Sequence, residues 1–200
     1  MLKKFAVCAA VLLLSLTAVA SQNNPDKQSV CKTTPKKSNI LLLGDSLAQG
    51  MASEFYVKAK TSNYRPVVLA KSGSQSFQWS TKIEKIMCDF RPKVTIVSLG
   101  TNDSGAKDVE FLRAHVKRIR DAAQKYGSKI LWILPRQLPS RFKGQDGIRA
   151  IISEEIKETH DARLLTIEMS NDQIHPTSRG YRKWFQDVWE NLANKEIICL

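Results

Sequence analysis

Residues 40–51 read Ile-Leu-Leu-Leu-Gly-Asp-Ser-Leu-Ala-Gln-Gly-Met. A short apolar run that ends at Gly44 and is followed by helix-forming residues is typical of a buried strand, a tight turn and the start of a helix. This order places Ser46 in the first turn of the helix, where backbone N–H groups lack intrahelical acceptors and the helix dipole favours negative charge. Asp45 and Ser46 could equally act only as helix caps, so the tripeptide alone does not decide a function.

Four further apolar runs follow the same pattern, each separated from the next by an amphipathic helical segment. Short apolar strands that alternate with helices are typical of a parallel sheet with helices on both faces. The sequence therefore predicts an α/β fold, a three-layer α/β/α sandwich around a five-stranded parallel sheet. The later strands are expected at residues 66–70, 94–99, 129–134 and 164–167, and the later helices at 77–88, 108–126, 147–159 and 176–193.

The first twenty residues have the layout of a cleaved secretory signal. Lys3 and Lys4 precede an apolar run, which closes with Ala-Val-Ala at Ala20. The run is short for a membrane span, so a retained anchor is the weaker alternative, and we expect a secreted or periplasmic protein. The expected parts of the chain are a signal peptide at residues 1–20, a linker or N-terminal tail at 21–38 and the functional domain at 39–200.

Export also affects which cysteines remain in the mature protein and whether they are expected to form a disulfide. After removal of the signal, Cys31, Cys88 and Cys199 remain, and an oxidising compartment favours one disulfide and one free thiol. The sequence does not choose among the three pairings. All three cysteines are expected at the end of the sheet opposite Ser46, which favours a structural disulfide over catalysis. The sequence contains no metal-ligand spacing.

The chain is strongly basic. Removing Lys3 and Lys4 from its 31 Lys and Arg residues leaves 29 against 19 Asp and Glu residues, a formal charge of +10. Such a charge favours encounter with anionic partners, and we expect transient contact with an anionic cell-envelope surface. The basic residues are scattered, with no Arg-rich run and no nucleic-acid-binding motif, so no nucleic acid partner is expected.

In a parallel sheet of this kind, ligands bind beyond the carboxyl ends of the strands. Ser46 lies in such a segment, and of the three histidines only His175 does; His115 is expected at the rim and His160 in solvent. A nucleophilic serine needs a neighbouring base, and the base needs an acceptor that orients it. Asp172, three residues before His175, supplies that acceptor, although it could also be only a helix cap. The candidate catalytic triad is therefore Ser46, His175 and Asp172.

Acyl transfer also needs N–H donors for the negative charge that develops on the carbonyl oxygen. The backbone N–H of Ser46, the N–H of Gly73 and the side-chain amide of Asn102 follow three different strands and could converge on one oxygen. Gly73 suits this role because it has no Cβ to obstruct a substrate. Gly73 and Asn102 are also common turn residues, and each alone favours that simpler interpretation.

Four segments carry these residues in order along the chain: Gly44-Asp45-Ser46-Leu47 with Gly50, then Gly73, then Gly100 with Asn102-Asp103, then Asp172 with His175-Pro176. As an ordered set they resemble the SGNH subgroup of the GDSL hydrolases, over about residues 39–192. The resemblance implies an α/β/α sandwich with flavodoxin-like strand order and no cofactor. It also implies a triad of Ser46, His175 and Asp172, and an oxyanion hole formed by Ser46, Gly73 and Asn102.

The leading hypothesis is an exported serine esterase that acts on a small-molecule or carbohydrate ester, removing acetyl or another small acyl group from a cell-envelope carbohydrate. One alternative is a lysophospholipase or thioesterase acting on long acyl chains, and another is an exported binding module without turnover. The polar, cationic loop over residues 136–143 disfavours an acyl-chain groove. Arg136 and Arg141 are the candidate contacts for an anionic substrate, and a monomer is expected.

Overall fold

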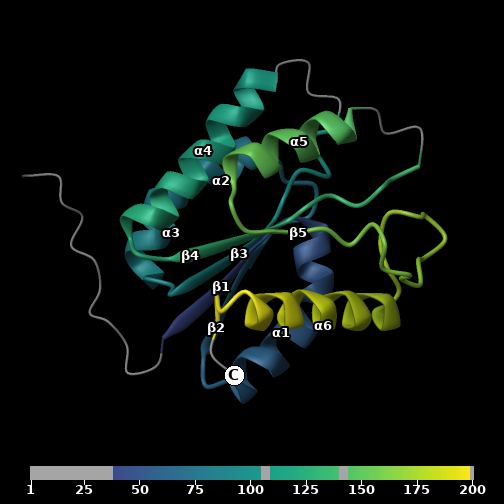
Figure 1. The fold of residues 1–200 in the computed structure, drawn as a ribbon, viewed down its shortest axis with the longest axis horizontal. Helices are drawn as coiled ribbons and strands as arrows, with labels where there is room; N and C mark the ends of the chain where they lie inside the picture. Colours follow the sequence, from purple (N-terminus) through teal and green to yellow (C-terminus); the bar gives the residue numbers. More distant parts are fainter. Residues whose placement is uncertain (1–37, 105–108, 140–143, 199–200) are drawn as a thin grey trace, which may run out of the picture.

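The computed structural model describes residues 38–104, 109–139 and 144–198. Five parallel strands form one sheet in the order β2-β1-β3-β4-β5 (Figure 1). This arrangement confirms the predicted α/β fold and its flavodoxin-like strand order. The strands are β1 (Asn39–Gly44), β2 (Arg65–Ala70), β3 (Val94–Ser98), β4 (Lys129–Ile133) and β5 (Thr159–His160).

Helices cover both faces of the sheet (Figure 1). Ile40 and Leu42 of β1 pack into one helical layer, while Leu41 and Leu43 pack into the other, and all four are fully buried. Because successive residues of a strand face opposite sides, a strand that is apolar throughout suits a sheet covered on both faces. The first layer is α1 (Ser46–Thr61) and α6 (Ser178–Asn194), and the second is α2 (Ser76–Ser80), α3 (Ile83–Phe90), α4 (Val109–Lys125) and α5 (Gln145–Glu155).

The strand order reverses at β1. The chain passes from β1 to β2 on one side, and α2 and α3 then lead it to β3 on the other side. The carboxyl ends of β1 and β3 therefore border the crevice in which ligands bind in such sheets. Gly44 permits the two strands to approach here, because a Cβ at this position would lie 2.2 Å from the backbone oxygen of Ser98.

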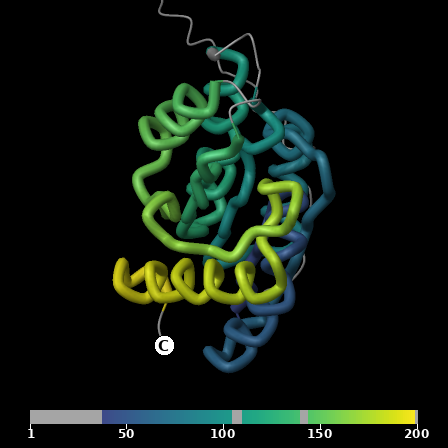
Figure 2. The backbone as a smooth tube through the Cα atoms, turned by 90° about the vertical axis from the view of Figure 1, so that its right-hand side faces the viewer, coloured from purple at the N-terminus to yellow at the C-terminus, as the bar shows by residue number. Residues whose placement is uncertain are grey.

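The last strand differs from the prediction. The run 164–167, predicted as the fifth strand, lies in the loop between α5 and α6 (yellow-green in Figure 2), where Leu164 is 99% exposed. The paired residues are those of β5, and the prediction of a solvated His160 is also wrong. His160 is 3% exposed, and its Nε2 lies 2.7 Å from Oδ2 of Asp187. Because β5 is an edge strand that pairs with only two residues of β4, it has no apolar run of its own.

Three predicted helices also have different bounds. The helix predicted over 147–159 is α5, which begins two residues earlier and ends at Glu155, before β5. The predicted helix over residues 77–88 is divided into α2 and α3. At the division, the hydroxyls of Ser80 and Thr81 donate to backbone carbonyls of the preceding turn, and such bonds compete with the helix. Helix α6 begins two residues later than predicted, because the Thr177 side chain caps it by accepting a 3.1 Å hydrogen bond from the N–H of Gly180.

The described part of the chain contains one of the three cysteines of the expected mature protein. Cys88 is 2% exposed in α3 and is disulfide-bonded. Because α3 leads into β3, Cys88 lies towards the amino ends of the strands, at the opposite end of the sheet from Ser46. The parts of the prediction that lie outside the described residues are Cys31, Cys199, the signal peptide at 1–20 and the tail up to residue 37. None of the helices in the described ranges is long and apolar enough to cross a membrane.

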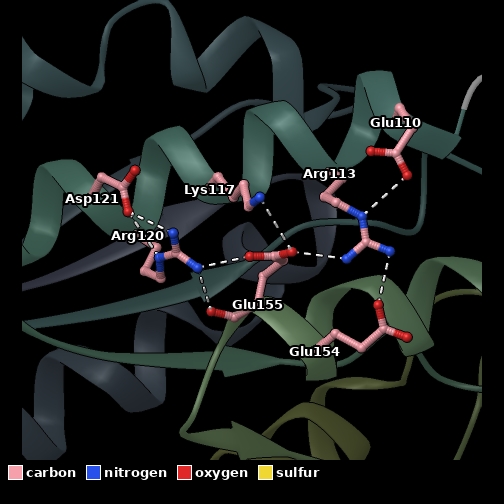
Figure 3. Close-up of polar contacts among 7 residues, drawn as sticks. All are labelled: Glu110, Arg113, Lys117, Arg120, Asp121, Glu154 and Glu155. Carbon is pink, nitrogen blue, oxygen red and sulfur yellow. Dashed lines mark hydrogen bonds and ion pairs between the residues drawn. The ribbon is translucent and has the colours of Figure 1, made fainter.

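A cluster of charged side chains joins α4 to the end of α5 (Figure 3). Glu155 accepts from Nη1 of Arg113 at 2.8 Å and from Nη1 of Arg120 at 2.7 Å, and its side chain is 10% exposed. Arg113 also contacts Glu154 at 2.8 Å. The two arginines are seven residues apart and therefore lie on one face of α4. This cluster therefore links α5 to α4 by ion pairs.

Candidate active site

Ser46 stands at the carboxyl end of β1 as the first residue of α1. Asp45 is the buried N-cap, and its Oδ1 accepts a 2.9 Å hydrogen bond from the N–H of Leu47. The N–H of Ser46 itself has no acceptor within the helix, as is general for a first turn. The Ser46 side chain is half-buried, and its Oγ lies 2.8 Å from Nε2 of His175.

Asp172 holds the His175 ring in the turn before α6. Oδ2 of Asp172 lies 2.6 Å from Nδ1 of His175, and Oδ1 accepts 2.9 Å hydrogen bonds from the backbone N–H groups of Ile174 and His175. The bond from the His175 ring, followed by these backbone bonds, holds the pKa of the Asp172 carboxyl well below its usual range. The ionised carboxylate accepts the Nδ1 proton, which leaves Nε2 of His175 as the acceptor that faces Ser46.

Gly73 forms the exposed turn after β2. Its φ is +72°, a conformation that favours glycine. No described heavy atom beyond its chain neighbours lies within 4 Å of the position that a Cβ would take, so the backbone faces open space. The turn is held from below by Ser74, whose Oγ donates to the backbone oxygen of Lys71 at 2.7 Å and accepts from Nε1 of Trp79 at 2.8 Å.

Asn102 connects the three segments that follow β1, β2 and β3. Its Nδ2 donates to Oδ2 of Asp45 and to the backbone oxygen of Ser74, both at 3.1 Å. Its backbone oxygen accepts from Nε2 of Gln75 at 2.7 Å. Both N–H bonds of the Asn102 amide are thus directed to protein acceptors, and an incoming oxyanion would have to share or replace one of them.

Two buried carboxyl groups lie beneath this crevice. Burial, with a smaller contribution from the charge of Asp103, raises the pKa of Asp45 to about 7, although the hydrogen bond from the Leu47 N–H acts in the opposite direction. Burial also raises the pKa of Asp103, although this carboxyl accepts from the N–H of Ser76 at 3.1 and 3.2 Å and from its hydroxyl at 2.9 Å. Asp103 thereby ties the start of α2 to the loop that carries Asn102.

The structure brings together residues from all four predicted segments. Ser46, His175 and Asp172 form one chain of hydrogen bonds. Sequence reasoning missed Ser170, whose hydroxyl donates to Oδ1 of Asp172 at 2.8 Å. A hydroxyl residue two positions from an aspartate is common in turns, but nothing in the sequence tied this one to the site.

The structure describes only one of the two arginines that were predicted to contact an anionic substrate. Arg136 follows β4, with Cζ 5.8 Å from the centroid of the Trp184 ring, while Arg141 lies outside the described residues. His115 is half-buried on α4, where its Nδ1 lies 2.7 Å from Oγ of Ser80. Within the described ranges, no group of three or more His, Cys, Asp or Glu side chains is arranged to hold a metal ion.

Comparison with known proteins places this site in context. Residues 42–183 match the GDSL-like Lipase/Acylhydrolase family. This match covers more than half of the chain and includes Ser46, Asn102, Asp172 and His175. No curated protein sequence matches the chain.

Solved structures share the fold at low sequence identity. A GDSL-like lipase from Bacteroides thetaiotaomicron VPI-5482 superposes with a TM-score of 0.65 at 16% identity, over 84% of this chain and 93% of that one. The psychrotrophic esterase EstA from Pseudoalteromonas sp. gives 0.66 at 18% identity, over 80% and 98%. Est24, a carbohydrate acetylesterase from Sinorhizobium meliloti, gives 0.66 at 13% identity, over 80% and 100%.

Proposed function

The chain belongs to the GDSL-like lipase/acylhydrolase family and is a hydrolase of ester bonds, and from this premise we propose that it is an exported serine esterase with Ser46, His175 and Asp172 as its catalytic triad. The observation that carries the proposal is the unbroken chain of hydrogen bonds from Asp172 through both ring nitrogens of His175 to Ser46 Oγ, at 2.6 and 2.8 Å. A nucleophilic serine requires these contacts.

The reaction proceeds through an acyl-enzyme. Ser46 Oγ attacks the ester carbonyl carbon while Nε2 of His175 takes the hydroxyl proton, and Asp172 stabilises the resulting imidazolium. Collapse of the tetrahedral intermediate breaks the bond to the alcohol, which leaves with the proton from Nε2. A water molecule then attacks the acyl group, with His175 again as the base, and the acid product is released as Ser46 recovers its proton.

The oxyanion is bound by the N–H groups of Ser46 and Gly73 and by the amide of Asn102. The position of Ser46 at the start of α1 and the open space beside Gly73 support the first two donors. For Asn102, one of the hydrogen bonds to Asp45 and Ser74 must be shared with the oxyanion or given up. Asn102 therefore both joins the loops and stabilises the transition state.

The substrate is a carbohydrate or other small-molecule ester with a short acyl group, met at the cell envelope after export. Two considerations support this choice. One fold relative is a carbohydrate acetylesterase, and the basic charge of the chain favours anionic surroundings. The N-terminal sequence supports export, because its basic residues, apolar run and small residues follow the order of a secretory signal.

A substrate panel tests this function. Acetylated sugars, lysophospholipids, acyl-thioesters and aryl esters of graded length are offered to the wild type and to Ser46→Ala. We expect the wild type to prefer short acyl groups, and Ser46→Ala to lose nearly all turnover while its circular dichroism spectrum stays unchanged. Equal turnover by the folded Ser46→Ala variant would exclude the triad, and preference for long acyl chains would replace the proposed substrate by lysophospholipids or thioesters.

A further inference from the structure

Arg136 is a half-buried cationic group whose role the proposed triad leaves unexplained. Its guanidinium packs on the indole of Trp184, and its Nε and Nη1 atoms are buried without a hydrogen-bond partner among the described residues. A buried charge is costly unless it is paired. The sequence made Arg136 a candidate contact for an anionic substrate, and the structure shows that two of its three guanidinium nitrogens are buried without an acceptor among the described residues.

Two acidic side chains on segments next to Arg136 have basic partners other than Arg136. The Arg149 guanidinium donates to the backbone oxygen of Pro135 and reaches Asp161 at 2.6 Å, which places Asp161 close to this loop. Asp161 also pairs with Arg163 at 2.7 Å. On α6, Asp187 lies three residues after Trp184 and accepts from His160 instead.

The indole of Trp184 provides another donor without an acceptor in the described part of the chain. Its Nε1 is likewise buried with no hydrogen-bond partner among the described residues. Within the described ranges, Arg136 and Trp184 therefore carry unpartnered donors on neighbouring side chains, and an anionic group could accept from the guanidinium.

The position of Arg136 relates it to the proposed active site. A Cβ on Gly100 would lie 2.7 Å from Cγ of Pro135, so the loop after β4 contacts the loop that carries Asn102. Trp184 belongs to α6, the helix that His175 precedes. Since β4 lies two strands from β1, the strand ends that lead to Arg136 and to Ser46 are roughly 10 Å apart along the carboxyl edge of the sheet.

The segment that carries Arg136 is held on both sides. Pro135 accepts from Arg149, and the N–H of Leu138 donates to Oε1 of Gln145 at 3.0 Å. Leu138 and Gln145 are each 5% exposed. Arg136 therefore stands on a fixed support, which is what a specific binding group needs.

We propose that Arg136 is a specificity-determining residue that binds a carboxylate of the ester substrate, away from the scissile carbonyl. This inference rests on the proposed function of Ser46 and narrows its substrate class to esters that carry an acidic group. A guanidinium suits a carboxylate because it can donate two parallel hydrogen bonds. The half-buried position makes the contact short-range rather than a general attraction.

Two matched pairs of esters test the proposal. The first is mono(4-nitrophenyl) suberate and its methyl ester, with the carboxylate in the acyl part. The second is 3-(4-acetoxyphenyl)propanoate and its methyl ester, with the carboxylate in the alcohol part. We expect the wild type to show kcat/KM at least about tenfold higher for the charged member of one pair. Arg136→Gln should bring this ratio close to one and leave the methyl esters within about twofold of wild type.

Two further variants separate the contact from general charge. Arg136→Lys keeps the charge without the two-pronged geometry and should retain only part of the preference. Arg179→Gln removes an exposed charge near the start of α6 and should retain all of it. A wild-type ratio close to one in both pairs overturns the proposal, and so does an undiminished preference in folded Arg136→Gln. If Arg136→Gln does not fold, an undiminished preference for the charged ester in folded Arg136→Lys overturns the proposal, and a reduced preference supports it.

Failure of the proposed function gives a different result. In that case the wild type hydrolyses neither member of either pair, and calorimetric titration with suberate tests the anion site without turnover. Binding to Ser46→Ala that is lost in Ser46→Ala/Arg136→Gln supports the Arg136 site, and absence of binding to Ser46→Ala overturns it.

Discussion

Nε2 of His175 lies 2.8 Å from Oγ of Ser46, although 129 positions separate the two residues along the chain. One residue begins the first helix and the other stands in the turn before the last, and these two helices pack together on one face of the sheet. The contact therefore depends on how α6 packs on α1. At Gly50 of α1 a Cβ would lie 2.1 Å from the ring of Tyr181, so a glycine is needed for this close approach.

Removing the charge of Asp172 should reduce turnover strongly without unfolding the protein. An asparagine can still accept from the backbone N–H groups of Ile174 and His175 through its oxygen, but it cannot stabilise the imidazolium. We expect Asp172→Asn to lower kcat for a short-chain aryl ester by about 10³-fold or more. Asp121→Asn, on the exposed side of α4, is the control and should have full activity. A loss below tenfold in Asp172→Asn would show that the carboxylate does not orient His175.

Asn102 is expected to affect both catalysis and stability. Replacing it by alanine removes a proposed oxyanion donor, which should lower kcat about a hundredfold. The same change breaks the contacts to Asp45 and Ser74 and should lower the free energy of unfolding by about 1–2 kcal/mol. Steady-state kinetics and urea denaturation measure the two effects, with the exposed Gln124→Ala as control. A kcat within threefold of wild type would remove Asn102 from the oxyanion hole.

The buried Asp45 should make stability depend on pH near neutrality. Its pKa is raised from 3.8 to about 7, so between these values the folded state binds a proton that the unfolded state has released. The free energy of unfolding therefore falls as the pH rises through this range, by an amount on the order of 4 kcal/mol, and stays low above pH 7. Asp45→Asn lacks this titration.

The difference in unfolding free energy between wild type and Asp45→Asn isolates this effect from other titrating groups. Urea denaturation between pH 4 and pH 8 should show the wild type losing stability relative to the variant as the pH increases. A difference that is constant over this range would mean that Asp45 is ionised throughout in the folded protein.

The cluster around Glu155 should stabilise the packing of α5 on α4. Hydrogen bonds from Arg113, together with the charges of Lys117 and Arg120, lower the pKa of Glu155 below 4.5. Its stabilising contribution is present above that value and is lost as the pH falls through the lowered pKa. We expect Glu155→Gln to lower the free energy of unfolding by about 1 kcal/mol at pH 7 and by much less at pH 3.

Glu154→Gln is the matched control for this cluster. Glu154 is more exposed than Glu155 and contacts only Arg113 among the ion pairs shown in Figure 3, so its replacement should cost less. Equal stability losses in the two variants would show that burial of Glu155 adds nothing to the contact.

Local pattern predicted much of the fold. The first four strands and the long helices agree with the structure to within a few residues, because burial on both faces of a sheet and on one face of a helix imposes different spacings of apolar residues. The same reasoning was wrong for residues 164–167. Ile167 of that run is buried although it lies in a loop, and β5 is ordered by its pairing with β4, which a local pattern does not reveal.

Residue types and their order along the chain also pointed to Ser46, Gly73, Asn102, Asp172 and His175. The first three follow strands of the sheet, whereas Asp172 and His175 follow residues 164–167, which form a loop instead of the predicted strand. The hydrogen bonds that join the loops beneath the triad were beyond this reasoning. The bonds of Asn102 to Asp45 and Ser74, and those of Asp103 to Ser76, join segments that are far apart in sequence.

The sequence by itself determined the class of fold, the order of its strands along the chain and the residue types available for acyl transfer, because these follow from short-range spacing and side-chain chemistry. Only the tertiary structure decided which of these groups touch, which carboxyl groups are buried and where Arg136 points. Such contacts depend on strand register and on the packing of helices across the sheet, and these are set by the chain as a whole.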